Sequence, residues 1–165
     1  MERPVVLTRE MRSEDARAFL DVHHAAVRGV AAKDYPLAVI DAWAPLPVTD
    51  DAIERVRANP DQEYRLIAEI EGCVVGIGAA VFELGELRAC YVAPDARGRG
   101  VGAPLVKELE RAARERGVRR LELDSSVTAE TFYRRAGYEV LEQREHVLRN
   151  GQRMACVKMG KDLGA

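Results

Sequence analysis

Cysteine and histidine are scarce in this chain of 165 residues, and their scarcity argues against two kinds of site. The cysteines lie far apart, and an odd number of them is not typical of a disulfide framework. No Cys-x-x-Cys or His-x-x-x-His pair occurs, so the sequence predicts no metal site. The residues concerned are Cys73, Cys90, Cys156, His23, His24 and His146.

A surplus of charge and a long apolar run are missing as well. Lys and Arg number 25 and Asp and Glu number 27, a net charge of −2, so we expect neither nucleic acid nor a membrane as the partner. No apolar run reaches the roughly 20 residues that cross a bilayer. Met1-Glu2-Arg3-Pro4 is not followed by an apolar stretch of the signal-peptide type, so we expect a cytoplasmic protein.

The composition that remains is that of an ordinary globular protein. Apolar residues make up 47% of the chain and charged residues 32%. The sequence has no repeat, linker or low-complexity segment, and its length suits one hydrophobic core. We therefore expect residues 1–165 to form a single domain.

The first sixty residues predict one strand and three helical stretches. The strand is expected at 5–8, and Ser13 is expected to cap the first helix. A second helical stretch begins near Pro36 and carries Trp43. Thr49 is expected to cap the third.

The rest of the chain predicts strands that alternate with helices. Three strands joined by turns are expected at 64–70, 74–82 and 86–93, followed by a helix at 101–116, a strand at 119–124 and a helix at 128–135. Asn150-Gly151 predicts a type I′ hairpin between two final strands. The fold class is therefore α/β, with a mixed, mostly antiparallel sheet and helices on both faces.

A glycine-rich turn between a strand and a helix is the most informative segment: Arg97-Gly98-Arg99-Gly100-Val101-Gly102. Glycines let backbone approach a ligand closely, and the first N–H groups of a helix lack partners, so this turn predicts a phosphate site. It is not a dinucleotide fingerprint, because Leu105 replaces the third glycine. Nor does it end in the Gly-Lys-Ser/Thr of a phosphate loop.

The spacing of this turn and of a second motif resembles the GNAT superfamily of acyl-CoA-dependent N-acyltransferases. The resemblance runs from about residue 5 to residue 160. The stretches that carry it are Tyr91-Val92-Ala93-Pro94, Arg97-x-x-Gly100-x-Gly102 and Ala129-x-x-Phe132-Tyr133-x-x-x-Gly137-Tyr138.

The resemblance implies a sheet that is split between its fourth and fifth strands and takes acetyl-CoA in the gap. It places the diphosphate on the backbone N–H groups of the turn and the pantetheine arm beside the strand before it, like an added strand. Ser126 stands where many members have an asparagine that contacts this arm; it could instead cap the following helix. The implied coenzyme-binding residues are Cys90, Tyr91, Val92, Arg97, Gly98, Arg99, Gly100, Val101, Gly102, Ala103 and Ser126.

The resemblance also implies the catalytic groups. Tyr133 matches the general acid that protonates the coenzyme A sulfur, and a backbone N–H of Tyr91 or Val92 is the expected oxyanion donor. Glu86 matches a glutamate that removes the amine proton through water. Three other carboxylates are alternatives to it: Glu122, Asp124 and Glu83. Cys90 lies on the coenzyme strand and suggests a covalent acyl-cysteine route. No histidine lies nearby in sequence to activate its thiol, which argues against that route.

The expected activity is direct transfer of an acetyl group from acetyl-CoA to a primary amine in a ternary complex. The alternative is a non-catalytic acyl-CoA-binding or regulatory module. The acceptor, a small-molecule or a protein amine, stays open; the four carboxylates favour a cationic one, and the C-terminal strands leave a homodimer open. In this family the region that shapes the acceptor site contains His23, His24, Arg28, Lys33, Asp34, Tyr35, Asp41 and Trp43.

Overall fold

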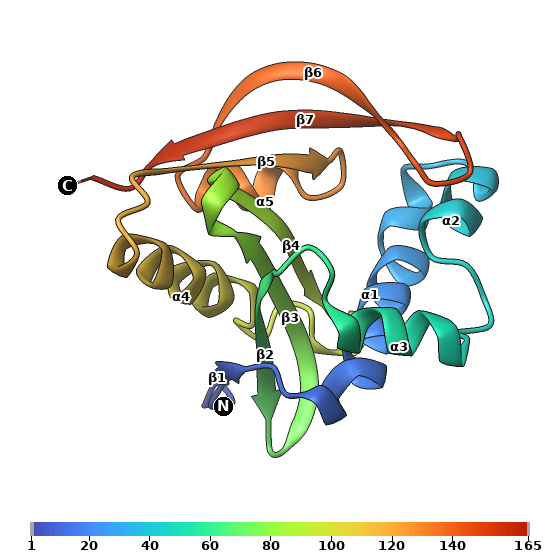
Figure 1. Ribbon diagram of the computed structural model, residues 1–165, viewed down its shortest axis with the longest axis horizontal. Coiled ribbons are helices and arrows are strands. Elements are labelled where there is room, and N and C mark those ends of the chain that lie inside the picture. Colours follow the sequence, from blue (N-terminus) through green and yellow to red (C-terminus); the bar gives the residue numbers. More distant parts are fainter. Residues whose placement is uncertain (1, 165) are drawn as a thin grey trace.

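The chain is built around a seven-stranded sheet, shown in Figure 1. The computed structural model describes residues 2–164. The strands lie in the order β1-β2-β3-β4-β5-β7-β6, and only β4 and β5 are parallel neighbours. Their bounds are β1 Leu7–Glu10, β2 Tyr64–Ile70, β3 Cys73–Val81, β4 Glu86–Val92, β5 Arg120–Ser126, β6 Glu139–Val147 and β7 Arg153–Asp162.

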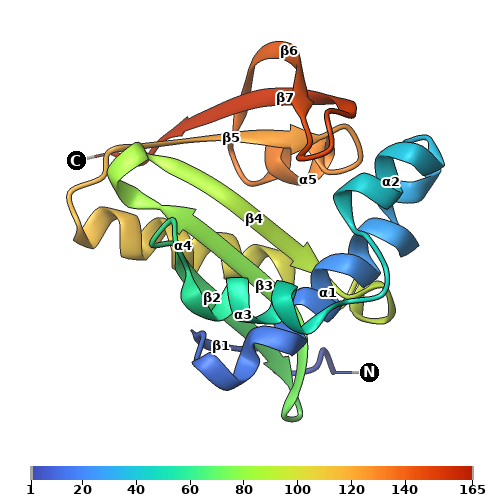
Figure 2. The ribbon, with the colours of Figure 1, turned by 45° about the vertical axis from the view of Figure 1, so that its right-hand side comes forward.

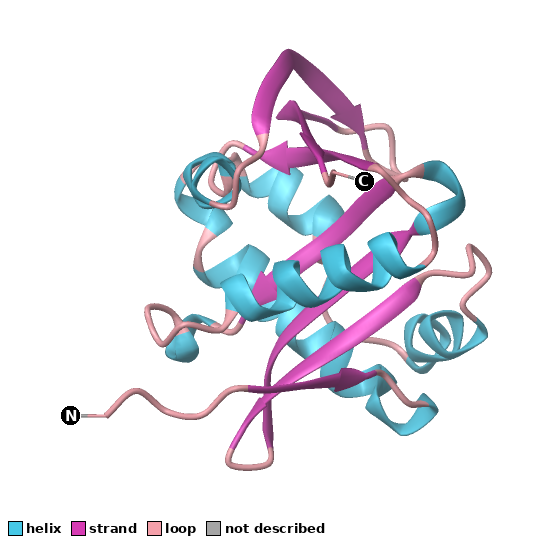
Figure 3. Ribbon diagram, turned by 90° about the vertical axis from the view of Figure 1, so that its left-hand side faces the viewer, coloured by secondary structure: helices cyan, strands magenta, loops and turns pink. Residues whose placement is uncertain are grey.

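Helices cover both faces of this sheet, as the side view in Figure 3 shows. Alternating residues of β2 point to opposite sides: Leu66 packs in the cluster of α4, whereas Ile67 packs against Phe19 of α1. None of the helices described within residues 2–164 is long and apolar enough to cross a membrane. The helices are α1 Ala16–Gly29, α2 Leu37–Trp43, α3 Asp50–Ala58, α4 Gly102–Glu115 and α5 Glu130–Arg135.

Glycines on β3 bring α4 close to the sheet. A Cβ on Gly76 would lie 2.7 Å from Cγ1 of Val101 and 2.9 Å from Cδ1 of Leu105. A Cβ on Gly78 would lie 3.1 Å from Leu109. The first turns of α4 can therefore rest on backbone, which fixes where the glycine-rich turn stands relative to β4.

The sheet opens between β4 and β5. Their register contains one pair, Glu86 with Glu122, and the Glu122 N–H donates to the carbonyl of Gly85 at 2.9 Å. Beyond this point β4 has no strand partner on that side within residues 2–164, and the two strands diverge in Figure 2. The expected split between the fourth and fifth strands is confirmed.

A β-bulge in β4 accounts for the divergence. Ala79 of β3 pairs with Ala89 and Ala80 pairs with Leu87, so Arg88 has no opposite residue. A bulge bends its strand and increases the local twist. It also reverses the alternation of side chains, so that Leu87 and Cys90 both pack on the α4 side.

The sequence predicted most elements correctly, but three of its predictions about their ends and turns are wrong. The first strand is β1, Leu7–Glu10, rather than 5–8. Ser13 does not cap the first helix, because the Asp15 carboxylate accepts the Arg12 N–H at 2.7 Å and Ser13 opens a 3₁₀ turn instead.

The type I′ turn predicted at Asn150-Gly151 is the third. That turn needs positive φ at both central residues, and only Gly151 has it, at 87°. The connection spans residues 148–152, and the Leu148 N–H donates to the carbonyl of Gln152 at 2.8 Å. The Thr49 cap is confirmed, since its hydroxyl accepts the Ala52 N–H at 3.2 Å.

A buried ionic network ties α4, α5 and β7 together. Lys161 Nζ of β7 lies 2.8 Å and 3.0 Å from the two carboxylate oxygens of Glu110, which is 4% exposed. Lys161 also donates to the carbonyl of Ala136, at the end of α5, at 2.7 Å. The Tyr138 hydroxyl donates to Glu110 at 3.2 Å. The network therefore holds α5 in place beside α4.

Substitution of Lys161 tests this network. We expect Lys161→Met to lower the free energy of unfolding by about 3 kcal/mol, because Glu110 would keep its burial and lose its cation. Lys158→Met is the matched control, since Lys158 lies on the same strand and approaches its partner Glu122 only to 3.9 Å. Urea unfolding of the two variants makes the measurement. Equal losses in both would contradict the assigned role.

Candidate active site

The glycine-rich turn presents backbone toward open space. Gly98 and Gly100 have positive φ, 75° and 77°, and a Cβ on either would meet no atom within 4 Å. Within residues 2–164 their N–H groups have no backbone acceptor, and the same holds for Val101. The first N–H groups of α4, on Gly102 and Ala103, lack partners inside the helix. These donors can bind an anion.

Strand β4, the glycine-rich turn and helix α5 meet at Gly102. The Cys90 thiol of β4 donates to the Gly102 carbonyl, with the sulfur 3.8 Å from the oxygen. A Cβ on Gly102 would lie 2.8 Å from the ring of Phe132 on α5. The glycine is therefore required by packing between α4 and α5, and the spacing of the motifs has a geometric reason.

Tyr133 stands beside this junction with its hydroxyl unengaged. The side chain is 6% exposed and its ring makes edge contacts with Phe132 and Tyr138, at centroid distances of 5.1 Å and 5.8 Å. Burial, with Cys90 and Tyr91 nearby, raises the pKa of the Tyr133 hydroxyl well above its ordinary value of 10.0. No fully enclosed side-chain N or O among the described residues lacks a partner. Since no partner for the Tyr133 hydroxyl is found there, that oxygen reaches accessible space as a protonated donor.

Cys90 is unsuited to nucleophilic attack. Burial raises the pKa of its thiol to about 12, so the thiolate is scarce at neutral pH. Its thiol donates a hydrogen bond to the Gly102 carbonyl, which is not a base and cannot deprotonate it. The geometry therefore disfavours the acyl-cysteine route.

Glu86 and Glu122 lie next to each other where the split begins. They form the single register pair of β4 and β5, and both alternate with leucines that pack on the α4 side. Both carboxylates therefore face the side of the sheet that carries α1. Glu86 Oε1 lies 3.4 Å from Nε of Arg88, and both glutamates are partly exposed.

The two remaining carboxylates have other surroundings. Asp124 pairs with Arg144 of β6 at 3.3 Å. Glu83 belongs to the turn before β4. Together with Arg116 it lines a cavity that none of the other three carboxylates reaches. Glu122 lies 3.8 Å from Arg120 and 3.9 Å from Lys158. Glu86, Glu122 and Asp124 thus each have a basic neighbour within 4 Å, which weakens the charge argument for a cationic acceptor.

Ser126 serves the turn before α5. Its hydroxyl accepts the N–H of Ala129 at 3.2 Å, and its carbonyl accepts the same N–H. The hydroxyl thus closes a turn ahead of α5 and does not cap that helix, whose N-cap is Ala129 without a side-chain cap bond. The expected acid and the expected coenzyme strand are brought together in the fold, whereas Glu86 lies at the far, closed end of β4.

Tyr35 connects the two sides of the split, a role that the sequence did not reveal. Its hydroxyl donates to the carbonyl of Ala155 on β7 at 2.6 Å and accepts the N–H of Val127, just after β5, at 2.8 Å. Next to it, Thr128 donates to Asp34 at 2.7 Å. These partners lie about a hundred residues away in sequence, so no local pattern marks them.

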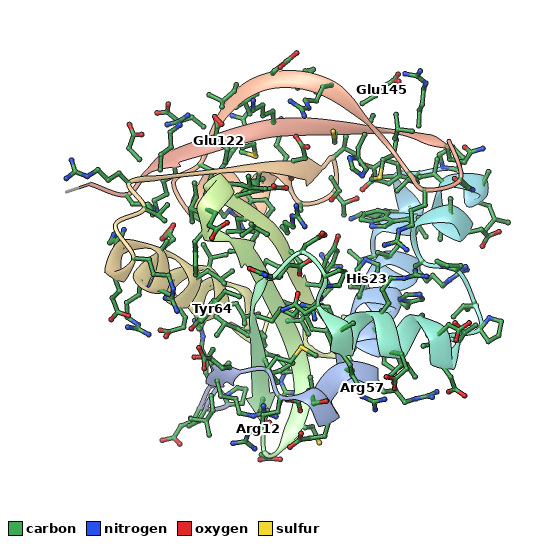
Figure 4. All side chains as sticks on the ribbon, in the orientation of Figure 1. Arg12, His23, Arg57, Tyr64, Glu122 and Glu145 are labelled. Carbon is green, nitrogen blue, oxygen red and sulfur yellow. The ribbon has the colours of Figure 1, made fainter. Side chains whose placement is uncertain are left out.

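An aromatic cluster lies on the α1 side of β4 and consists of His23, Tyr35, Trp43 and Tyr91. The His23 and Tyr91 ring centroids are 4.8 Å apart, and Trp43 lies 6.3 Å from Tyr91. His23, labelled in Figure 4, also approaches His24, with 3.2 Å between their Nδ1 atoms. Burial first, and then His24, lower the pKa of His23 to about 3, so its ring is neutral at physiological pH.

A cavity of 660 Å³ opens beside this cluster, a size that suits a small ligand. Its wall comes from α1, the connection between α2 and α3, α3 itself and the loop between β6 and β7. His23 and Trp43 form its inner end, next to Tyr91. Among residues 2–164 no three His, Cys, Asp or Glu side chains gather so that they could hold a metal ion.

Solved structures of acetyltransferases share the fold of this chain. The chain resembles a GCN5-related N-acetyltransferase from Rhodopseudomonas palustris, with a TM-score of 0.86, 29% identity, and coverage of 98% of this chain and 97% of that one. It also shares the fold of yncA, a putative acetyltransferase from Salmonella typhimurium with its cofactor acetyl-CoA, with a TM-score of 0.71, 20% identity, and coverage of 98% and 95%.

A curated relative is similar over part of its length. The chain is 35% identical over 88 residues to an IAA acetyltransferase from Azospirillum brasilense, which is 49% of this chain and 57% of the relative. The chain therefore spans little more than half the length of that protein.

The family model of the GNAT acetyltransferases matches residues 25–138, well over half of the chain. The matched range contains β4, the glycine-rich turn, α4 and Tyr133. The chain therefore belongs to the acetyltransferase (GNAT) family.

Proposed function

We propose that this acetyltransferase moves an acetyl group from acetyl-CoA to a primary amine, by direct transfer in a ternary complex. The observation that carries the proposal is the Tyr133 hydroxyl beside the unpaired edge of β4: its side chain is buried, its oxygen reaches accessible space, and it is protonated and without a partner among the described residues. A protein that only stored or sensed acyl-CoA would not need such a donor at that position.

The chain offers a fitting site for the coenzyme. Open space over Gly98 and Gly100 leaves room for a diphosphate on the free N–H groups, and Arg97 and Arg99 add positive charge there. The unpaired edge of β4 at Cys90, Tyr91 and Val92 supplies backbone groups to the pantetheine arm. Bound acetyl-CoA would supply an acetyl group activated as a thioester.

Tyr133 supplies a proton to the departing sulfur. Its raised pKa keeps the proton on the oxygen in the resting state. The burial that raises the pKa of the nearby Cys90 thiol to about 12 would likewise make a departing thiolate basic enough to accept that proton. The backbone N–H of Tyr91 or Val92 donates to the carbonyl oxygen as that oxygen gains negative charge.

The attacking amine must lose a proton, since a lysine-like amine has a pKa of about 10.4. Glu86 serves as the base through water. Glu122, its register partner, is the competing assignment because the two carboxylates share one face of the sheet. Both lie on the face that carries the aromatic cluster and the cavity, and an amine bound there approaches β4 from the side opposite α4.

We expect Tyr133→Phe to lower kcat about 10²- to 10⁴-fold with little change in the affinity for acetyl-CoA, because it removes only the proton donor. The measurement is thiol release from acetyl-CoA in the presence of a panel of amines. Tyr64→Phe is the matched control, since burial raises the pKa of the Tyr64 hydroxyl as well but Tyr64 lies on β2, outside both motifs. An unchanged kcat in Tyr133→Phe would remove the acid assignment.

Removal of each carboxylate separates the two candidate bases. We expect Glu86→Gln to lower kcat/KM by at least about 10²-fold and Glu122→Gln to lower it less than about 3-fold. Steady-state kinetics at saturating acetyl-CoA gives both values. The reverse ranking would transfer the role to Glu122. Binding of acetyl-CoA with no turnover of any amine would favour the non-catalytic module instead.

A further inference from the structure

The cavity beside the aromatic cluster has an apolar wall and a charged rim. Its inner end is formed by His23 and Trp43, and Leu20, Pro45 and Val56 extend the apolar surface. Both histidines there have a pKa lowered by burial, so the inner end carries no positive charge at neutral pH. The inner end can therefore accept the uncharged amine that the reaction requires.

Carboxylates on the rim are already engaged by arginines. Asp41 lies 2.7 Å from Arg28, and Asp61 lies 2.7 Å from Arg88. Glu63 is bonded to a third arginine, Arg65, at 3.2 Å. Each of these carboxylates therefore already has a guanidinium partner.

Two arginines on the same rim have no carboxylate partner among the described residues. Arg55 projects from α3 and Arg149 from the loop between β6 and β7, and both line the cavity. Neither has a carboxylate partner within the part of the chain that the structure describes. Three arginines and three carboxylates line the cavity, and among the described residues only one of these arginines, Arg65, has a carboxylate partner. Arg55 and Arg149 come from segments more than ninety residues apart in sequence, and each offers an uncompensated positive charge to the same cavity.

We propose that the acceptor is a small amine that also carries a carboxylate, such as an apolar α-amino acid, with the carboxylate held by Arg55 and Arg149. This inference rests on the proposed N-acetyltransferase function and names the substrate class of that site. A guanidinium group binds a carboxylate through paired N–H donors, and the apolar wall takes the side chain. The neutral inner end receives the amine next to β4.

Matched pairs of substrates test the proposal. Thiol release from acetyl-CoA is measured with L-leucine and L-methionine and with their carboxamides, which keep the amine and lose the negative charge. We expect kcat/KM of the wild-type protein to favour the acid by about 10- to 100-fold. In the double variant Arg55→Gln, Arg149→Gln, the ratio of acid to amide should fall to about 1, with turnover of the amide within about 3-fold of wild type.

Arg57→Gln is the control, because Arg57 lies on α3 as well but pairs with Glu54 and lies outside the lining of this cavity. It should leave the acid-to-amide ratio unchanged. Equal or better turnover of the amides by the wild-type protein would overturn the inference, and so would a double variant that keeps the preference. Acetylation of polyamines alone would overturn it while the N-acetyltransferase function stands. Binding of acetyl-CoA without acetylation of any amine would overturn both the inferred substrate class and the proposed N-acetyltransferase function.

Discussion

The parting of β4 from β5 is the constraint on which the site depends. Both strands are held at one end by the pair of Glu86 with Glu122, and the bulge at Arg88 then bends β4 away. The divergence leaves backbone donors and acceptors of β4 unpaired in the interior of a sheet, which is costly unless a ligand or water satisfies them. A strand edge that a cosubstrate can complete is therefore built into the fold.

The same bulge determines which side chains of β4 face α4 and which face the opposite side of the sheet. Cys90 is turned toward α4 and contacts Gly102, where the glycine-rich turn and α5 also meet. Tyr91 is turned the other way, into the aromatic cluster at the inner end of the cavity. The proposed coenzyme site and the proposed acceptor site thus lie on opposite sides of one strand, and Tyr133 stands beside that strand.

Local patterns in the sequence predicted the element order and the glycine-rich turn, because these depend on residues close together in the chain. The choice of Tyr133 came instead from the resemblance to the GNAT superfamily. The hairpin at Asn150 failed because tertiary pairing selected a longer connection than the dipeptide favours. Tyr35 and Arg149, which has no carboxylate partner in the described part of the chain, could not be recognised from the sequence, since their surroundings come from distant segments. That the Ser126 hydroxyl closes a turn ahead of α5 also depends on geometry that spacing does not supply.

Amide hydrogen exchange with and without acetyl-CoA tests the central claim most directly. The account predicts that acetyl-CoA slows exchange at the N–H groups of residues 98–103 and along 90–92, because it binds the first set and pairs with the second. Amides on the buried pair β2–β3 should change little. Unchanged exchange at both segments under saturating acetyl-CoA, or protection confined to another part of the chain, would contradict the account.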